Sequence, residues 1–336
     1  MNDSCLDTAA AEALRQYEHQ MYAVIYSIIL LPGLIGNVLA LWVFHAYVKE
    51  TKKAVIFMIN LAVADLLQVL SLPLRIYYYL NNSWPFGRGL CMFFFYLKYV
   101  NMYASIFFLA CISVRRCMMV LHPLSYTACR RRLDRGLCAG AWLLVCLCCL
   151  PFPLIRGGGV NTKDCFAELP MVDLAPRTGL GLLVAAELLG FLLPFGIVGT
   201  CTWLTAGSLR AGPARVPQDR GEKRRALRMV LGCAGVFLLC FLPYHVTFPL
   251  HYAAKAKAQW QTSCQFAISI RHIHPATLCL ASLNCCLDPV MYYFTTEEFR
   301  RRLSRQDLSD TLHLQQRRIS CMTTDDKNHN SEQAPL

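Results

Sequence analysis

Charged side chains lie inside two stretches of the chain that otherwise avoid water. Residues 61–80, "LAVADLLQVLSLPLRIYYYL", hold Asp65 and Arg75, and residues 93–114, "FFFYLKYVNMYASIFFLACISV", hold Lys98. A Lys, Arg or Asp at the centre of a membrane helix costs about 2.5–3.5 kcal/mol, so such residues usually pair, face a cavity or carry function. These three charges are therefore the first candidates for a functional site.

Arg75 and Lys98 are expected to belong to a positively charged, aromatic-lined cluster that opens outward, here called the outer cluster. Lys98 lies seven residues after Cys91, about 10 Å along a helix. The other members expected to bind a ligand are Tyr79, Tyr99, Tyr103, Phe152, Arg156, Tyr244, Phe248 and Lys257. Arginine grips a phosphate or carboxylate with two parallel hydrogen bonds, and tyrosine hydroxyls donate more. The outer cluster therefore favours an anionic ligand.

A plainer interpretation of these charges is internal pairing. Lys98 would pair with Glu187, the one acid of its apolar segment, and Arg156 would extend to the lipid headgroups. Arg75 would still lack an acid nearby, because Asp65 lies ten residues away, about 15 Å along the same helix. Alternatively, Glu187 binds a ligand amine while the cations hold the acidic groups of the ligand.

A second group of polar residues is expected at mid-depth and is here called the inner cluster. Its members are Asn37, Asp65, Asn101, Ser105, Asn284 and Asp288. Two carboxylates among neutral oxygen atoms would hold a small hard cation, because like charges a few ångströms apart repel unless a cation or proton intervenes. The alternative is a hydrogen-bond network that only packs the helices together. The residue types alone leave both interpretations open.

Seven apolar segments must position these side chains. Hydrophobic residues make up 55% of the 336 residues, charged residues only 16%, and the mean hydropathy is +0.37. About 20 apolar residues cross a bilayer core of ~30 Å. The segments cover residues 21–48, 54–80, 91–121, 137–155, 178–204, 226–252 and 266–294. The sequence thus predicts an all-α membrane protein with seven transmembrane helices.

Basic residues set the expected orientation. Most of the 33 Lys and Arg lie in the tail, in the loops after the first, third and fifth segments, and at the adjoining helix ends. The positive-inside rule places that side in the cytoplasm and the N-terminus outside, as in a multi-pass protein of the plasma membrane. The net charge of +12 then reflects topology and attraction to anionic membrane lipids, and no nucleic-acid partner is expected.

Four regions follow along the chain. Residues 1–20 form a polar extracellular segment without the features of a cleavable signal peptide, and residues 21–294 form the transmembrane domain. Residues 295–310 are expected to form a short amphipathic helix on the inner membrane surface. Residues 311–336 are polar and are expected to be a disordered cytoplasmic tail.

Cysteines and glycosylation signals agree with this topology. Of 18 cysteines, those on the predicted outer side are Cys5, Cys91, Cys165 and Cys264. An even number in an oxidising compartment suggests two disulfides, with three connectivities open. The sequons at Asn2 and Asn81 also fall outside and are expected to accept glycans.

Other classes of membrane protein fit the sequence less well. A transporter should show internal repeats, and none is found. A light sensor of similar architecture would need a lysine in residues 266–294, which contain none. An enzyme would need a nucleophile and a base at recognisable spacing, and the histidines near the outer end have no such partner. The protein is therefore not expected to be an enzyme.

Short motifs along nearly the whole chain resemble the rhodopsin-like (class A) G-protein-coupled receptors. They are "GNVLALWV" with Asn37, "NLAVADLL" with Asp65, Cys91, Trp142, Pro194, "CFLPYH" and "NCCLDPVMYY" with Asp288, Pro289 and Tyr292. Each alone is weak, but all of them in this order are very specific. "WPFG", "FYLKYVNMYAS" and "EFRRRLSRQDL" resemble the purinoceptor-like branch, and especially its lysophosphatidylserine receptors.

The resemblance implies a function, partners and residue roles. It implies an anionic lysophospholipid as ligand, most specifically lysophosphatidylserine, with a nucleotide or another anionic metabolite as the alternative and a transporter as the distant one. The acyl chain would lie along apolar surface between the fourth and fifth segments. The partner would be a heterotrimeric G protein of the Gs or twelve/thirteen class. The inner ends of the fifth and sixth segments would open most, and Arg116, Pro123 and Tyr292 would meet the partner.

The resemblance also implies two disulfides and an ion site. The disulfides would join Cys91 to Cys165 and Cys5 to Cys264. A structural or allosteric sodium ion would bind at Asp65, Ser105, Asn284 and Asp288, and no other cofactor is implied.

One motif departs from the pattern of the family. Most members have an acid, an arginine and a tyrosine at the inner end of the third segment, whereas this chain has Arg115, Arg116 and Cys117. Lys223 also stands where many members carry a pairing glutamate, and Thr202 replaces a tyrosine. Arg116, with no acid before it and repelled by Arg115, would be held less firmly at rest. We therefore expect appreciable signalling without added ligand.

Overall fold

The computed structural model describes residues 8–50, 55–122, 131–156, 165–166, 176–210, 217–255, 263–295 and 299–300. Every regular element in these ranges is helical. The chain divides into two compact units, Met1–Thr295 and Thr296–Leu336. The predicted amphipathic helix over 295–310 and the tail over 311–336 lie almost wholly outside the described residues.

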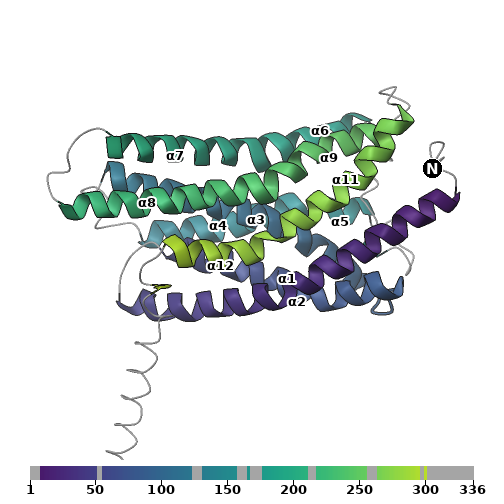
Figure 1. Cartoon of the computed structure of the whole chain (residues 1–336), viewed down its shortest axis with the longest axis horizontal. Coiled ribbons are helices and arrows are strands. Elements are labelled where there is room, and N and C mark those ends of the chain that lie inside the picture. The colour runs from purple at the N-terminus through teal and green to yellow at the C-terminus, as the bar shows by residue number, and fades with distance from the viewer. Residues whose placement is uncertain are drawn as a thin grey trace, which may run out of the picture. The chain divides into compact units, whose positions relative to one another are not determined.

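The first unit is a bundle of helices that run alongside one another (Figure 1). In chain order they are α1 (Thr8–Glu50), α2 (Ile56–Asn81), α3 (Arg88–Leu121), α4 (Arg131–Cys149), α5 (Pro151–Arg156), α6 (Pro176–Glu187), η3 (Leu188–Leu192), α7 (Leu193–Arg210), α8 (Pro217–Val236), η4 (Phe237–Phe241), α9 (Leu242–Lys255), α11 (Cys264–Ser282) and α12 (Asn284–Thr295). Within the described residues, six helical runs are long and apolar enough to cross a membrane. The seventh predicted segment corresponds to α11 and α12, which are separated at Leu283.

The first helix begins earlier than the sequence predicted. α1 is continuous from Thr8, whereas residues 8–20 were expected to belong to an extracellular segment outside the first transmembrane helix. The stretch is rich in Ala, Glu, Leu, Arg and Gln, which are strong helix formers. Its polarity excluded it from the apolar segment without preventing a helix.

Prolines account for the interruptions of the fifth and sixth transmembrane helices. The wide π-helical turns η3 and η4 each end two residues before a proline, Pro194 and Pro243 respectively. Proline lacks a backbone donor and its ring crowds the preceding turn. A π turn replaces the usual bonding, so that Leu193 donates to the carbonyl of Leu188 and Leu242 to that of Phe237. The helices therefore cross with a local widening instead of a break.

Proline also links α12 to α1. Pro289 cannot donate to the carbonyl of Cys285 one turn earlier, and Asn37 of α1 supplies the missing bond with its Nδ2 atom at 2.7 Å. A Cβ atom at Gly36 would lie 2.9 Å from the Pro289 ring, so the small residue permits the close approach.

The third helix is the centre of the bundle. α3 contacts α2, α4, α5, α7 and α8, whereas the main contacts of α4 are with α2, α3 and α5. The main contact of α6 is with η3. Residues on α3 can therefore reach most of the other helices, while the outer part of the fifth helix packs sparsely.

Candidate functional site

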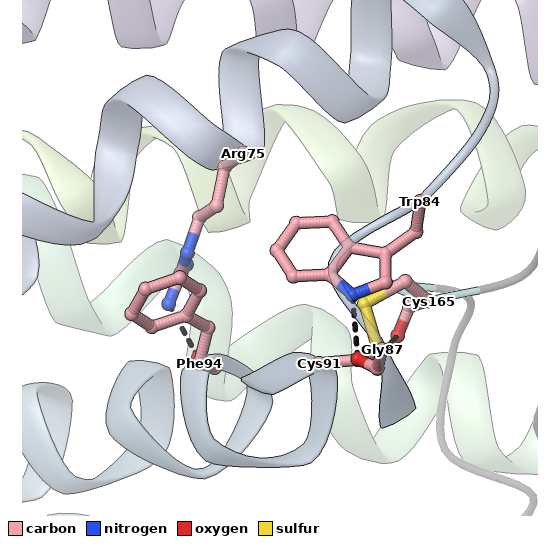
Figure 2. Close-up of a disulfide and its surroundings, with 6 residues drawn as sticks. All are labelled: Arg75, Trp84, Gly87, Cys91, Phe94 and Cys165. Atoms are coloured by element: carbon pink, nitrogen blue, oxygen red, sulfur yellow. Dashed lines mark hydrogen bonds between the residues drawn. A yellow bond between two sulfur atoms is a disulfide. The ribbon is translucent and has the colours of Figure 1, made fainter. Parts of the chain in front are cut away.

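A disulfide fixes the outer end of α3. Cys91, in the first turn of this helix, is bonded to Cys165 (Figure 2), as the resemblance implied. Trp84 donates from its indole nitrogen to the carbonyl of Gly87 at 2.8 Å. Gly87 has a φ of +82°, which glycine adopts without strain. The turn before α3 is thereby closed and Phe166, next to the disulfide, is brought over α2.

Arg75 is buried beneath this cap. Its side chain points from α2 to α3, where Nη2 donates to the carbonyl oxygen of Phe94 at 2.6 Å (Figure 2). The guanidinium lies 5.4 Å from the ring centre of Phe166 and interacts with the hydroxyl of Tyr26. Within the described residues no carboxylate pairs with Arg75, and its Nε has no hydrogen-bond partner. The residue is 1% exposed, so this is a buried cation with donor capacity to spare.

Aromatic residues of α1 surround Tyr79 beside Arg75. Tyr22 stacks on Tyr79 at 4.8 Å between ring centres, and Tyr26 meets it edge-on at 5.9 Å. His19 also contacts Tyr79, at 5.2 Å. These α1 residues and Phe166 were not predicted from the sequence. The spacing of Tyr22 and Tyr26, four apart on one helix face, was the available signal.

A second part of the outer cluster forms between α3 and α5. Tyr99 stacks on Phe152 with ring centres 4.5 Å apart, and both are buried. The Lys98 ammonium lies 5.8 Å from the centre of the Tyr99 ring. Arg156 ends α5, but its side chain lies outside the described part of the structure, as does the whole of Lys257.

Glu187 lies deeper, at the junction of α6 and η3. Its carboxylate pairs with Nδ1 of His245 at 3.1 Å, a partner that the sequence did not indicate. His245 stacks on Phe191 at 4.3 Å and meets Tyr103 edge-on at 6.0 Å. The ring of Tyr103 occupies the space beside Gly190, where a Cβ atom would lie 2.6 Å from Cε1 of Tyr103. Acid, imidazole and phenol thus share one polar spot among aromatic rings.

The sixth and seventh helices contribute a further aromatic wall. Tyr244 stacks on Phe248 with ring centres 5.5 Å apart, and both are buried. Beside them, the hydroxyl of Thr247 lies 3.0 Å from Nδ1 of His274 and 2.8 Å from the hydroxyl of Thr277. Both members predicted from this part of the chain therefore lie together.

The inner cluster assembles as expected. Asp65 is fully buried, and its Oδ1 accepts from the side chains of Asn101, Ser105 and Asn284 at 3.3 to 3.5 Å. Asp288 is also fully buried and interacts electrostatically with Asp65. Because two buried carboxylates in one site repel, a proton or a cation must accompany them. The donor set, carboxylates with amide and hydroxyl oxygens, suits a sodium ion.

The opposite end of α3 corrects one expectation. Arg115 forms an ion pair with Asp134 of α4, and both side chains are buried. The charge of Arg115 is therefore compensated, and its repulsion of Arg116 no longer supports ligand-free signalling. Tyr292 is buried, with its hydroxyl 3.5 Å from the carbonyl oxygen of Met58. Pro123 lies outside the described residues.

The predicted modifications are described in part. Asn81 is exposed at the end of α2, and its Nδ2 donates to the carbonyl of Tyr77 at 2.9 Å. Cys264 is disulfide-bonded, and its expected partner Cys5 lies outside the described residues, as does Asn2.

Comparison with known proteins places the chain in a family. Residues 36–292 match the family described as 7 transmembrane receptor (rhodopsin family). The chain therefore belongs to the rhodopsin family of seven-transmembrane receptors, multi-pass membrane proteins that couple to G proteins and are not enzymes.

Three relatives show where in this family the chain falls. It is 55% identical over 302 residues to Probable G-protein coupled receptor 174 of Mus musculus, which covers 89% of each chain. It is 47% identical over 297 residues to a purinoceptor of Homo sapiens, the tenth of its series, covering 88% of this chain and 87% of the relative. It is 33% identical over 287 residues to Lysophosphatidic acid receptor 6 of Gallus gallus, covering 84% of this chain and 92% of the relative.

Proposed function

We propose that this receptor responds to an extracellular anionic lysophospholipid, with lysophosphatidylserine as the specific candidate. The observation that carries the proposal is Arg75, a buried cation whose described neighbours are a carbonyl and aromatic rings and whose Nε lacks a hydrogen-bond partner. An incoming phosphate or carboxylate would satisfy that donor and the charge together. The name of Lysophosphatidic acid receptor 6 supports a lipid of this kind.

The ligand has parts that match other residues of the site. Lysophosphatidylserine carries a phosphate, a carboxylate, an ammonium group and one acyl chain. Tyr79, Lys98 and Tyr99 would share the acidic groups with Arg75, together with Arg156 and Lys257. Glu187 would bind the ammonium, because it is the acid among the described residues of its helix.

The acyl chain would leave the bundle between the fourth and fifth transmembrane helices. The main contacts of α4 are with α2, α3 and α5, and that of α6 is with η3, so this pair of neighbours packs sparsely. Apolar residues of the fifth helix, such as Leu188 and Leu189, are 51% and 68% exposed. A lipid tail would cover such surface without displacing a helix contact.

Ligand binding would shift the receptor toward the state that activates a G protein of the Gs or twelve/thirteen class. The receptor would act in the plasma membrane with its N-terminus outside, and sodium at the inner cluster would favour one of the two states. Signalling without ligand remains part of the proposal, because no acid precedes Arg116.

A nucleotide is the second candidate ligand, since its phosphates also suit Arg75 and the name of the purinoceptor relative points to purines. The test compares responses of cells expressing the receptor to lysophosphatidylserine and to nucleotide di- and triphosphates. We expect a response to the lipid that Lys98→Ala weakens and that Glu187→Gln weakens only for ligands with an amine. A nucleotide response without a lipid response would overturn the proposal.

A further inference from the structure

Arg115 and Asp134 join three helices at the end of the bundle that is rich in basic residues. The two side chains form an ion pair between α3 and α4, and each is less than one-tenth exposed. The Arg115 guanidinium also lies 5.9 Å from the ring centre of Phe57 of α2. Asp134 stands in the first turn of α4, where the helix dipole favours a negative charge. The pair thus fixes one face of α3.

The two residues that follow Arg115 face other helices. Successive side chains on an α-helix are about 100° apart. Arg116 acts electrostatically on Cys233 of α8, and Cys117 packs against Cys201 of α7 and Val230 of α8. Arg115, Arg116 and Cys117 therefore address α4, α8 and α7 in turn.

The contacts on these faces differ in kind. Toward α2 and α4, α3 is held by the charge pair, and Trp142 of α4 donates to Asn60 of α2 at 2.8 Å. Toward α7 and α8 the described contacts around Cys117 are thiols and small apolar side chains, which have no strong directional preference. The rotation of α3 about its axis is therefore set mainly on the side of Arg115.

We propose that Arg115 and Asp134 are positioning residues for G-protein coupling, which act by holding Arg116 toward α8. The proposal rests on the proposed role of Arg116 as a contact of the G protein. Buried ion pairs often add little net stability compared with apolar residues of similar volume, whereas loss of one partner leaves an uncompensated charge. A pair of apolar replacements consequently separates positioning from stability.

The test uses the full-length receptor in lipid nanodiscs and measures its affinity for a purified nucleotide-free G protein, together with its melting temperature. Arg115→Met/Asp134→Leu removes both charges. We expect it to melt close to the wild type but to bind the G protein about tenfold more weakly, as Arg116→Ala does. Adding Arg116→Ala to the double variant should cause no further loss, because the pair acts through Arg116. Arg115→Lys, which keeps the charge, should retain most of the affinity.

Each alternative result has a distinct meaning. Wild-type affinity in the double variant, or additive losses on combination with Arg116→Ala, would overturn the proposal and leave the pair a purely structural one. Failure of the wild type to bind the G protein would overturn it together with the coupling role of Arg116. A receptor that binds the G protein but ignores lysophosphatidylserine would overturn only the ligand assignment.

Discussion

Arg75 of α2 donates to the backbone carbonyl of Phe94 of α3 at 2.6 Å, so a buried cation is held by a neutral acceptor (Figure 2). A carbonyl orients the guanidinium without cancelling its charge. Phe166 covers the same group from the disulfide-linked segment. The outer end of the bundle therefore keeps a fixed positive group ready for an anionic partner.

The disulfide should matter for ligand binding as well as for stability. Cys165→Ser removes a link between residues 74 apart in sequence, a loss that typically costs about 2–5 kcal/mol, and it releases Phe166 from Arg75. We expect a lower melting temperature and weaker lysophosphatidylserine binding. Phe166→Leu keeps the link, so it should weaken binding with little change in melting. Unchanged lipid affinity in both variants would contradict this role of the cap.

Gly190 should be required for the position of Tyr103. A Cβ atom at Gly190 would lie 2.6 Å from the Tyr103 ring, whereas at Gly196 on the same transmembrane helix it would meet nothing within 4 Å. We expect Gly190→Ala to lower the potency of lysophosphatidylserine in a cellular assay, and Gly196→Ala to leave it unchanged at equal surface expression. Equal potency of the two variants would exclude a contribution of the Tyr103 position to ligand binding.

The inner cluster should make the receptor sensitive to sodium. Asp65 and Asp288 are both buried, and a bound cation would stabilise the folded state by mass action. The melting temperature of the purified receptor should rise in sodium chloride relative to choline chloride, and Asp65→Asn should abolish the difference. A wild type that melts identically in both salts would favour a shared proton and a network that only packs the helices.

Cys117 and Cys201 offer a way to test whether α3 and α7 separate on activation. Their thiols are in direct contact and both residues are buried, so a chemical oxidant should join them as a disulfide. We expect oxidised receptor to lose G-protein activation and a reductant to restore it. Cys201→Ser should be insensitive to the oxidant. Full activation by the cross-linked wild type would mean that the two helices stay together.

Much of the site could be predicted because apolar segments make each polar residue conspicuous. Asp65, Asn284 and Asp288 stood out in this way and meet in the structure. Arg75 was singled out for the same reason, and its lack of a described acid partner agrees with the sequence-based interpretation.

The remaining contacts depended on geometry that a linear pattern does not carry. His245 as the partner of Glu187 requires the relative rotation of two helices, each of which contains a π turn. Asp134 stands in a basic, polar stretch at the start of α4, where nothing in the sequence distinguished it from a solvated charge. The expected repulsion between neighbouring arginines failed because Asp134 was overlooked.

Binding of lysophosphatidylserine to purified Arg75→Gln receptor tests the central claim most directly. Hydrogen bonds to charged groups are worth about 1.5–3 kcal/mol, so we predict a loss of affinity of about 10- to 100-fold. Arg88→Gln, at an exposed position at the start of α3, is the matched control and should bind like the wild type. Wild-type affinity in Arg75→Gln would contradict the assignment of Arg75 as the anchor of an anionic ligand.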